Sequence, residues 1–420
     1  MSEWKKYKLS ELYEMSSGIS STKDQAGHGS PFLSFSVVFN NYFLPDSLID
    51  LMDTTVGEKQ KYSINEGDIF LTRTSETVDE LAMSSVALKD YPEASFSGFL
   101  KRLRPVDKTI VYPKFMAFYL RSPLFRRTII NNTVMTLRAS FNEAMFSYLE
   151  IMLPDFDTQK KIGDFLYSLE KKKQINNQIN QELEAMAKTL YDYWFVQFDF
   201  PDQNGKPYKS SGGKMVYNPE LKREIPEGWG VETLVDNTLS KVIKPGIDHF
   251  TQKTYLATGD VVNTSIKDGR LITFENRETR ANMQPSVNSV WFAKMKSSNK
   301  HLFLSHSMKE LIDSTILSTG FMGLQCKEES FEYIASFISD PNFEIFKDTL
   351  SHGATQEAVN IDDLRSVPVI IPDDYILREF HRIAKSIFLN LGRNMIEDKT
   401  LSSLRDWLLP MLMNGQVKVE

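Results

Sequence analysis

The chain has 420 residues, 41% of them hydrophobic and 25% charged, a composition typical of globular proteins. This length predicts two to four domains. The single cysteine, Cys326, excludes disulfide staples and favours a reducing compartment. The N-terminus carries no apolar signal region and no run of 18 apolar residues occurs, so we expect a cytoplasmic protein that is not inserted in a membrane.

The net charge of −6 by itself argues against a nucleic-acid-binding protein, but the charges are unevenly distributed. Residues 101–138 contain nine basic side chains and one acid, and residues 279–309 contain five basic side chains and no acid. Residues 310–379, by contrast, contain fourteen acids and four bases. Two basic windows in an acidic chain could bind one linear polyanion. A charged face that only contacts solvent is the alternative.

The first 155 residues predict a globule of strands and helices. Short β-rich segments (GDIFLTR, SSVALK and FLKRLRP) are separated by turn residues, and a helical pattern follows over 114–130.

Residues 156–198 then predict one long helix. Ile162 and Leu183 fall on the first position of a heptad (position a), and Phe165 and Ile179 fall on the fourth (position d). This repeat predicts a coiled-coil seam. A helix lying flat on a globule is the alternative, but its apolar stripe would be wider.

Residues 199–228 are rich in Gly, Pro and Ser and predict a turn-rich linker that could hold one hairpin. The linker contains Pro201-Asp202 followed by Glu220-x-Lys222, a pattern that could hold Mg²⁺ and activate water. The pattern is short and many chains match it by chance, so we rank a nuclease below a binding function.

Residues 229–373 repeat the first globule. Residues 330–372 align with residues 112–154 without a gap, displaced by 218 positions. Upstream segments align at slightly larger displacements, as expected if insertions lie in loops. Two similar halves can carry two similar sites related by a pseudo-twofold axis.

Residues 374–420 repeat the long helix and add a short tail, with Asn394 at the position equivalent to Asn176. In an antiparallel pair the equivalent midpoints meet, so we expect these two asparagines to lie side by side and to fix the register. The predicted fold class is mixed α/β (α+β), with two pseudo-twofold-related globules separated by an antiparallel two-helix coiled coil.

Common catalytic motifs are absent. The sequence contains no phosphate-binding loop, no dinucleotide-binding motif, no nucleophile elbow and no Cys/His set with metal-ligand spacing. We therefore expect no catalytic residue, no metal and no cofactor bound by this chain.

Several segments resemble the specificity subunit of type I restriction–modification systems. They are the helix entry IMLPDFDTQKKIGDFL, the helix exit TLYDYWFVQFDFP, the linker NGKPYKSSGGKMVYNPELKREIPEGW and the C-terminal WLLPMLMNGQV, and the resemblance covers nearly the whole chain. The second helix entry, PDDYILREF, departs from the Glu-Gln pair usual in that family, whereas the first copy keeps Gln159.

The resemblance implies a subunit that is not itself an enzyme and that chooses a bipartite double-stranded DNA target. Its two globules would be target-recognition domains, one for each half-site. Two modification subunits would methylate adenine with S-adenosylmethionine, and two restriction subunits would use ATP and Mg²⁺ for translocation and cleavage. The helices would act as a ruler of about 60 Å, which caps the separation near ~18 base pairs. The alternatives are a specificity chain for a methyltransferase alone and a self-contained Mg²⁺-dependent nuclease.

Both halves place a basic residue at an equivalent strand end, Arg73 in FLTRTS and Lys294 in FAKMKSS. Arginine can bind guanine through two hydrogen bonds, and Ser or Thr neighbours can donate to bases or phosphates. For Arg73 the alternative is a surface ion pair with Glu76 or Glu80. A second candidate loop in each half precedes a repeated asparagine. The base-reading candidates are Arg73, Thr74, Lys294, Lys296, Ser298, Asn299, Arg138 and Gln356.

The remaining basic residues of the two windows are expected to bind phosphate groups and to hold the protein on DNA without reading its sequence. These candidates are Lys101, Arg102, Arg104, Arg121, Arg126, Arg127 and Lys300.

Overall fold

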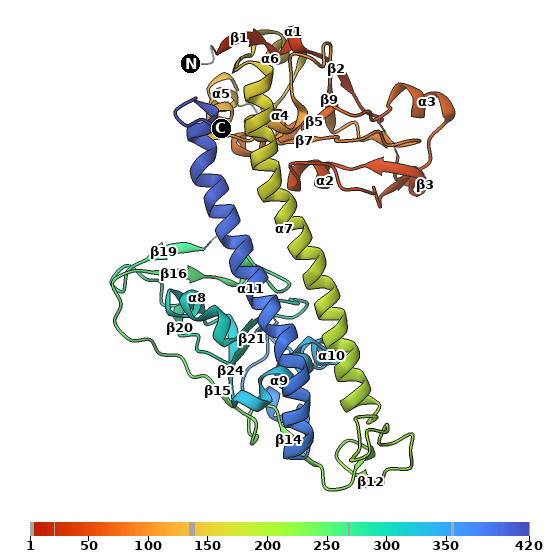
Figure 1. Cartoon of the computed structure of the whole chain (residues 1–420), viewed down its shortest axis with the longest axis vertical. Helices are drawn as coiled ribbons and strands as arrows, with labels where there is room; N and C mark the ends of the chain where they lie inside the picture. The colour runs from red at the N-terminus through yellow and green to blue at the C-terminus, as the bar shows by residue number, and fades with distance from the viewer. Residues whose placement is uncertain (1–3, 21, 134–138, 268, 354–356, 420) are drawn as a thin grey trace. The chain divides into compact units, whose positions relative to one another are not determined.

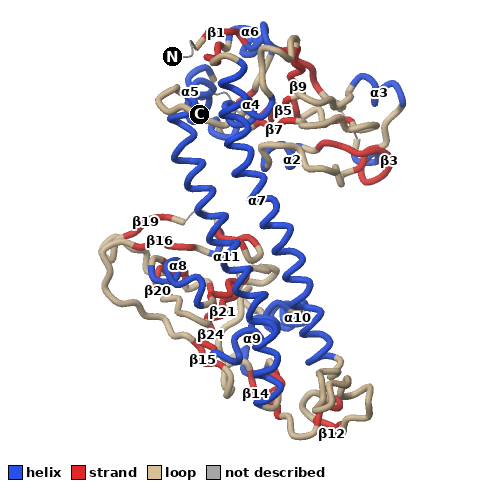
Figure 2. The backbone as a smooth tube through the Cα atoms, in the orientation of Figure 1, coloured by secondary structure: helices blue, strands red, loops and turns tan. Residues whose placement is uncertain are grey.

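The computed structural model describes residues 4–20, 22–133, 139–267, 269–353 and 357–419. The chain forms two compact units, here called unit 1 (Met1–Lys172 with Leu401–Glu420) and unit 2 (Lys173–Thr400). Each unit contains one globule and part of both long helices (Figure 1). Strands and helices are mixed in both units (Figure 2), which confirms the predicted mixed α/β class.

The globule of unit 1 is built on a four-stranded antiparallel sheet in the order β2-β9-β5-β7. A three-stranded sheet, β4-β3-β8, and two strand pairs, β1–β11 and β6–β10, complete it. The strands are β1 Lys5–Lys8, β2 Tyr13–Ser17, β3 Ala26–Leu33, β4 Leu51–Met52, β5 Ile69–Thr72, β6 Thr74–Ser75, β7 Ser84–Val86, β8 Ser95–Phe96, β9 Leu100–Pro105, β10 Ala139–Ser140 and β11 Glu150–Leu153. The helices are α1 Leu9–Leu12, α2 Phe35–Asn40, α3 Val56–Lys61, α4 Pro113–Tyr119, α5 Pro123–Asn132 and α6 Glu143–Tyr148.

The globule of unit 2 repeats this plan with additions. Its first four-stranded sheet has the order β15-β24-β21-β22, and a second has the order β19-β16-β23-β20. Strand pairs β12–β13, β14–β25 and β17–β18 are also present. The strands are β12 Met215–Asn218, β13 Arg223–Pro226, β14 Gly230–Thr233, β15 Ser240–Val242, β16 Lys253–Leu256, β17 Val261–Val262, β18 Ser265–Ile266, β19 Arg270–Ile272, β20 Ala281–Met283, β21 Ser289–Ala293, β22 His301–Leu304, β23 Thr315–Ser318, β24 Phe321–Cys326 and β25 Pro368–Ile371. The helices are α8 Lys309–Asp313, α9 Phe331–Ser339 and α10 Pro341–Leu350.

The repeat in the sequence is a repeat in strand register. Strand β1 pairs antiparallel with β11, with Lys5 opposite Leu153, and β14 pairs with β25, with Gly230 opposite Ile371. These two pairings coincide when the second half is aligned on the first. Helices α5 and α10 both begin with proline after a capping side chain, because proline lacks the N–H that a first helical turn leaves unpaired.

The central strands β5 and β21 are buried on both faces. In β5, Ile69 and Leu71 enter one apolar cluster and Phe70 enters another, as the two-residue period of a strand requires. Strand β21 divides its side chains between two clusters in the same way, with Phe292 in one and Trp291 in the other. These rigid strands position the residues that follow them.

Two long helices, α7 (Phe156–Tyr191) and α11 (Asp374–Met413), carry the predicted heptads. A single π-helical turn, Asp192–Val196, extends α7. In unit 1 the start of α7 and the end of α11 share one core cluster with the globule, and in unit 2 the end of α7 and the start of α11 do so.

The seam uses one of the two heptad positions that the sequence suggested. Position a is buried or half-buried in both helices, whereas most position d residues of α7 are exposed, as at Ile179 (43%) and Met186 (57%). Position e is buried instead, as at Ala187 of α7 and Ala384 of α11. The prediction of position d was therefore wrong at Ile179 and Met186, where the apolar side chain faces outward, whereas Phe165 is half-buried against the core of unit 1.

The middle of the helix pair in unit 2 is polar. The Asn176 amide donates to Asp398 Oδ1 and Glu397 Oε2, each at 2.8 Å, and the Asn394 amide donates to Asn180 Oδ1 at 2.8 Å. These contacts show an antiparallel pair, since rising numbers on α7 meet falling numbers on α11. The two contacts are related by the repeat. Residue 394 is the repeat equivalent of residue 176, and residue 398 is that of residue 180, so the contact 176–398 corresponds to the contact 394–180. A local pseudo-twofold axis therefore passes between the two contacts.

The expected side-by-side pairing of Asn176 with Asn394 needs correction by one helical turn. Asn176 bonds to Asp398, which lies four positions after Asn394. Asn394 likewise bonds to Asn180, which lies four positions after Asn176. Asn176 is fully buried, and its Oδ1 has no hydrogen-bond partner among the described residues. The polar centre is thus only partly satisfied, as in coiled coils that accept a cost in stability to fix register.

No helix in the described part of the chain is long and apolar enough to cross a lipid bilayer. Cys326 is a free, buried thiol whose pKa is raised by burial.

Candidate nucleic-acid interface

The structure brings the two candidate loops of the first half together. Arg73 follows strand β5, and the next two residues pair as β6 with β10, with Ser75 opposite Ala139 and Thr74 opposite Ser140. The backbone N–H of Phe141 donates to Arg73 O at 2.8 Å. We call residues 73–75 with 139–141 the first strand-end site.

The same meeting occurs in the second half. The backbone N–H of Lys296 donates to Glu357 O at 2.9 Å, and that of Val359 donates to Lys294 O at 3.0 Å. Residues 294–296 with 357–359 form the second strand-end site. These contacts match those of the first site under the repeat, so Arg73 and Lys294 occupy equivalent positions in three dimensions.

Arg73 is exposed, and its side chain makes one long hydrogen bond, 3.5 Å from Nη1 to Gly98 O. Among the described residues it forms no ion pair with Glu76 or Glu80, the alternative that its sequence neighbourhood offered. The Arg73 backbone N–H donates to the carbonyl of Phe99, whose ring is 66% exposed. The guanidinium is therefore available to a ligand, next to an exposed aromatic ring.

Lys294 lies in a more crowded position. Burial lowers the pKa of its ammonium group, and the positive charge of Arg280 lowers it further. Arg280 is exposed and pairs with no carboxylate in the described parts of the chain. Two neighbouring cations without a counter-ion make a local positive potential that an anion such as phosphate would relieve.

The turn between β21 and β22 continues from the second strand-end site. Lys296 Nζ forms an exposed ion pair with Glu357 at 2.7 Å, which raises the pKa of the lysine. Asn299 is exposed and Ser298 is half-buried. These side chains share one surface turn with Lys294, as a base-reading element requires.

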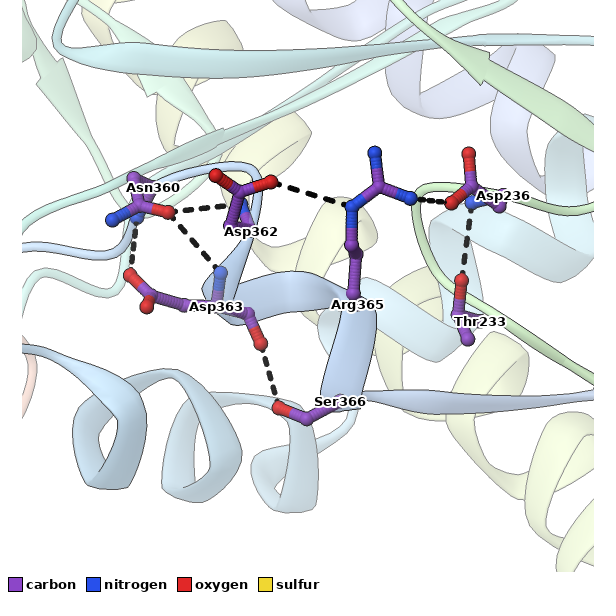
Figure 3. Close-up of polar contacts among 7 residues, drawn as sticks. All are labelled: Thr233, Asp236, Asn360, Asp362, Asp363, Arg365 and Ser366. Atoms are coloured by element: carbon purple, nitrogen blue, oxygen red, sulfur yellow. Dashed lines mark hydrogen bonds and ion pairs between the residues drawn. The ribbon is translucent and has the colours of Figure 1, made fainter.

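The repeated asparagines are structural caps. Asn142 Oδ1 accepts the N–H of Met145 at 2.9 Å and starts α6. Asn360 Oδ1 accepts the N–H groups of Asp362 (2.8 Å) and Asp363 (3.1 Å) (Figure 3). Each cap fixes the chain directly after the candidate loop that precedes it.

A second anchor follows Asn360. The Arg365 side chain lies between Asp362 and Asp236 and forms an ion pair with each (Figure 3). The Asp236 backbone N–H in turn donates to Thr233 Oγ1 at 3.2 Å, at the end of β14. The segment after the second candidate loop is thus tied to the globule through a strand that is far away in sequence.

Most of the predicted phosphate contacts are used inside the protein. Arg121 donates to the carbonyls of Ser84, Val38, Phe39 and Asn41, and burial lowers its pKa to about 10. Arg126 donates to the carbonyls of Leu81, Asp79 and Val78.

The basic residues of β9 are also engaged. Arg104 pairs with buried Asp68 at 2.6 Å, and Arg102 donates to Ser63 O at 2.6 Å. Lys101 is 6% exposed and contacts Ser17 and Glu143. These groups, together with Lys300, which donates to Thr258 O at 2.6 Å, stabilise the fold in this conformation. Arg127 alone of the predicted phosphate candidates is exposed without a side-chain partner in the described structure.

Two base-reading candidates, Arg138 and Gln356, lie outside the described residues. The linker residues of the nuclease pattern do lie within them. Asp202 Oδ1 accepts the N–H groups of Asn204 and Lys206 in a turn, at 2.8 Å each. Within the described ranges, no group of three or more His, Cys, Asp or Glu side chains could hold a metal ion.

Comparison with known proteins adds independent evidence. Residues 1–185 match the family model of the type I restriction modification DNA specificity domain. The chain is 24% identical to the type I restriction enzyme HindI specificity subunit of Haemophilus influenzae, over 99% of this chain and 100% of that one. It is also 24% identical to the type I restriction enzyme MjaIX specificity subunit of Methanocaldococcus jannaschii, over 65% of this chain and 61% of that one.

Among solved structures, the S subunit of a type I restriction–modification system from M. genitalium superimposes with a TM-score of 0.55. The identity is 12%, over 98% of this chain and 96% of that one, so this likeness speaks for the fold alone. The fold and its paired strand-end sites define a duplicated mixed α/β protein with one equivalent site in each half. Residues 1–185 match this specificity-domain family, and the HindI subunit aligns over its full length, so the chain is similar to the specificity subunits of type I restriction–modification systems.

Proposed function

We propose that this chain selects a bipartite DNA sequence, with one half-site read by each strand-end site. The observation that carries the proposal is the equivalence of Arg73 and Lys294, each at the end of a buried strand and beside a second loop. Direct readout needs side chains that are held by a rigid element and can reach base edges. Arg73, Thr74, Lys294, Lys296, Ser298 and Asn299 meet the first condition, and Arg138 and Gln356 stay predictions.

The partners in this proposal do the chemistry. Two modification subunits use S-adenosylmethionine to methylate an adenine that has left the base stack, and two restriction subunits use ATP and Mg²⁺. The chain itself holds no cofactor and works in the cytoplasm. A methyltransferase-only system is the second candidate, and ATP-dependent DNA cleavage by the assembled complex would separate the two.

An exposed apolar stripe on α7 fits the docking of a modification subunit. Three residues expected in the helix seam are exposed instead, with 43% for Ile179, 57% for Met186 and 37% for Tyr193 of the π-helical turn, and Ile175 beside them is 39% exposed. Their spacing of four and seven positions places them on one face of the helix. A partner helix with a matching apolar face would bury this stripe as a second seam. Trp407 of α11, which is 66% exposed in unit 1, offers a further aromatic contact.

The aromatic side chains at the end of α7 have a different role. Tyr191, Trp194 and Phe195 are buried in the core of unit 2, at 7%, 3% and 2% exposure. They are therefore part of the globule core and do not belong to the proposed docking surface.

Co-expression of the chain with its modification subunit, followed by genome-wide mapping of methylated adenines, tests the proposed function. We expect a motif of two short specific sequences separated by a nonspecific spacer. A continuous motif, or methylation without any motif, would show that the two sites do not read separate half-sites.

A further inference from the structure

A buried charged network lies under the turn that carries the second base-reading candidates. The side chain of Lys347 on α10 is fully buried, with Nζ 2.6 Å from Glu344 Oε2. The same Nζ donates to the main-chain carbonyl of Ser298 at 2.9 Å. A buried ammonium group is costly unless it is paired and hydrogen-bonded. The equivalent residue of the first half is Ile129, which is also fully buried, so an apolar side chain can fill this position.

The next residue of α10 binds the same turn. Asp348 Oδ1 accepts the backbone N–H of Ser297 at 2.8 Å. Ser297 has a φ of 55°, in the left-handed region that residues other than glycine rarely adopt. A strained residue keeps such a conformation only if its surroundings hold it there. Lys347 and Asp348 therefore hold the main chain of two successive residues of the turn, Ser298 and Ser297.

The network continues into the sheet. Glu344 Oε1 lies 3.0 Å from Nε2 of His301, the first residue of β22, whose side chain is 6% exposed. Glu344 thus joins Lys347 to the strand that leaves the turn. The helix contacts hold the turn through its main chain. The side chains of Ser298 and Asn299 remain for another partner, and that of Lys296 is held only by its exposed ion pair with Glu357.

We propose that Glu344, Lys347 and Asp348 are positioning residues for the second half-site. They hold the turn 294–300 in one conformation and so fix where its side chains meet base edges. The inference rests on the proposed function. In unit 1, α5 reaches the segment after its own strand-end site with a different side chain, since Arg126 donates to the carbonyls of Leu81 and Asp79. Both helices therefore support a recognition segment, but with unrelated chemistry.

The test compares Lys347→Met with the double variant Glu344→Gln/Lys347→Met, in the full chain co-expressed with the modification subunit. Methionine keeps the volume of lysine and removes the charge and the donor to Ser298. The double variant also neutralises the Glu344 carboxylate, which in Lys347→Met keeps only its contact with His301. Its melting temperature should therefore recover, because neutral pairs of similar volume can replace buried ion pairs at little cost. Lys309→Met, an exposed lysine of the same unit, is the matched control.

The readouts are the mapped methylation motif and the ratio of methylation rates on duplexes with intact and substituted half-sites. We expect both variants to relax one half of the motif by about 10-fold in discrimination and to leave the other half unchanged. The recovery of discrimination together with melting temperature in the double variant would overturn the proposal, since the role would then be only structural. An unchanged motif in Lys347→Met would also overturn it. Failure of the proposed function itself looks different, because the wild-type chain would then show no bipartite motif.

Discussion

Replacing Arg73 by alanine tests whether the first strand-end site reads bases. The guanidinium is exposed, and its described hydrogen bond to Gly98 O is 3.5 Å long, beyond the usual range for a strong bond. The change should therefore alter the free energy of unfolding by less than about 0.5 kcal/mol. If the side chain binds guanine through two hydrogen bonds, its loss removes about 1–3 kcal/mol of discrimination, or roughly 5- to 150-fold at one base pair.

The assay is equilibrium binding of the complex with its modification subunits, measured by fluorescence anisotropy at fixed salt. The duplexes carry the mapped site, single base substitutions in each half-site, or an unrelated sequence. Arg127→Ala is the control, because Arg127 is exposed on α5 outside the strand-end site. It should weaken binding to all duplexes equally and reduce the salt slope by about one.

An equal loss of affinity for the specific and the unrelated duplex would show that Arg73 does not read bases. A clear fall in melting temperature would also contradict a base-reading role, since the side chain would then stabilise the fold.

Three further predictions concern the fold and the partner surface. Arg126→Met should lower the free energy of unfolding by about 2–4 kcal/mol, because three carbonyls lose a charged donor. It should leave the salt slope of DNA binding unchanged, and thermal melting and a salt titration check the two results. Asn176→Ala should lower the melting temperature more than Asn394→Ala, because the first amide serves two carboxylates and the second serves one neutral amide; equal shifts would contradict this. Met186→Glu should weaken binding of the modification subunit by about 10-fold or more without changing the melting temperature. Gln178→Glu, at another exposed position of α7, should leave this binding unchanged, and pull-down titrations of both variants measure the difference.

The sequence predicted the repeat well because strand register and helix caps leave a local mark. Asn142 and Asn360 could be aligned without a gap, and both prove to cap the chain after a candidate loop. The strand-end residues could also be aligned. Their contact with a loop about 65 positions away could not be predicted, since only folding pairs β6 with β10.

The burial of charged residues was the feature that the sequence predicted least well. Nine basic side chains in one window indicated a DNA-binding face, but Arg104 and Arg121 donate to the protein's own acceptors. A sequence shows that an arginine is present and does not show whether carbonyls or phosphates will satisfy its five donors. Asp68 could have indicated the burial of Arg104, because its carboxylate forms an ion pair with the Arg104 guanidinium.

The helix seam shows a similar limit. Apolar residues at positions a, d and e all favour a packed helix, and their pattern alone does not tell which two positions face the other helix of the same chain. In this protein Ile179 and Met186 at position d remain exposed. Their exposure is the reason to expect that a partner subunit completes the packing.

The most direct test of two separate reading sites is methylation mapping of three chains in parallel: the wild type, Arg73→Ala and Lys294→Ala. The wild type should give a bipartite motif, and each variant should relax a different half of it while the spacer length stays the same. Relaxation of the same half by both variants, or an unchanged motif in both, would contradict the account.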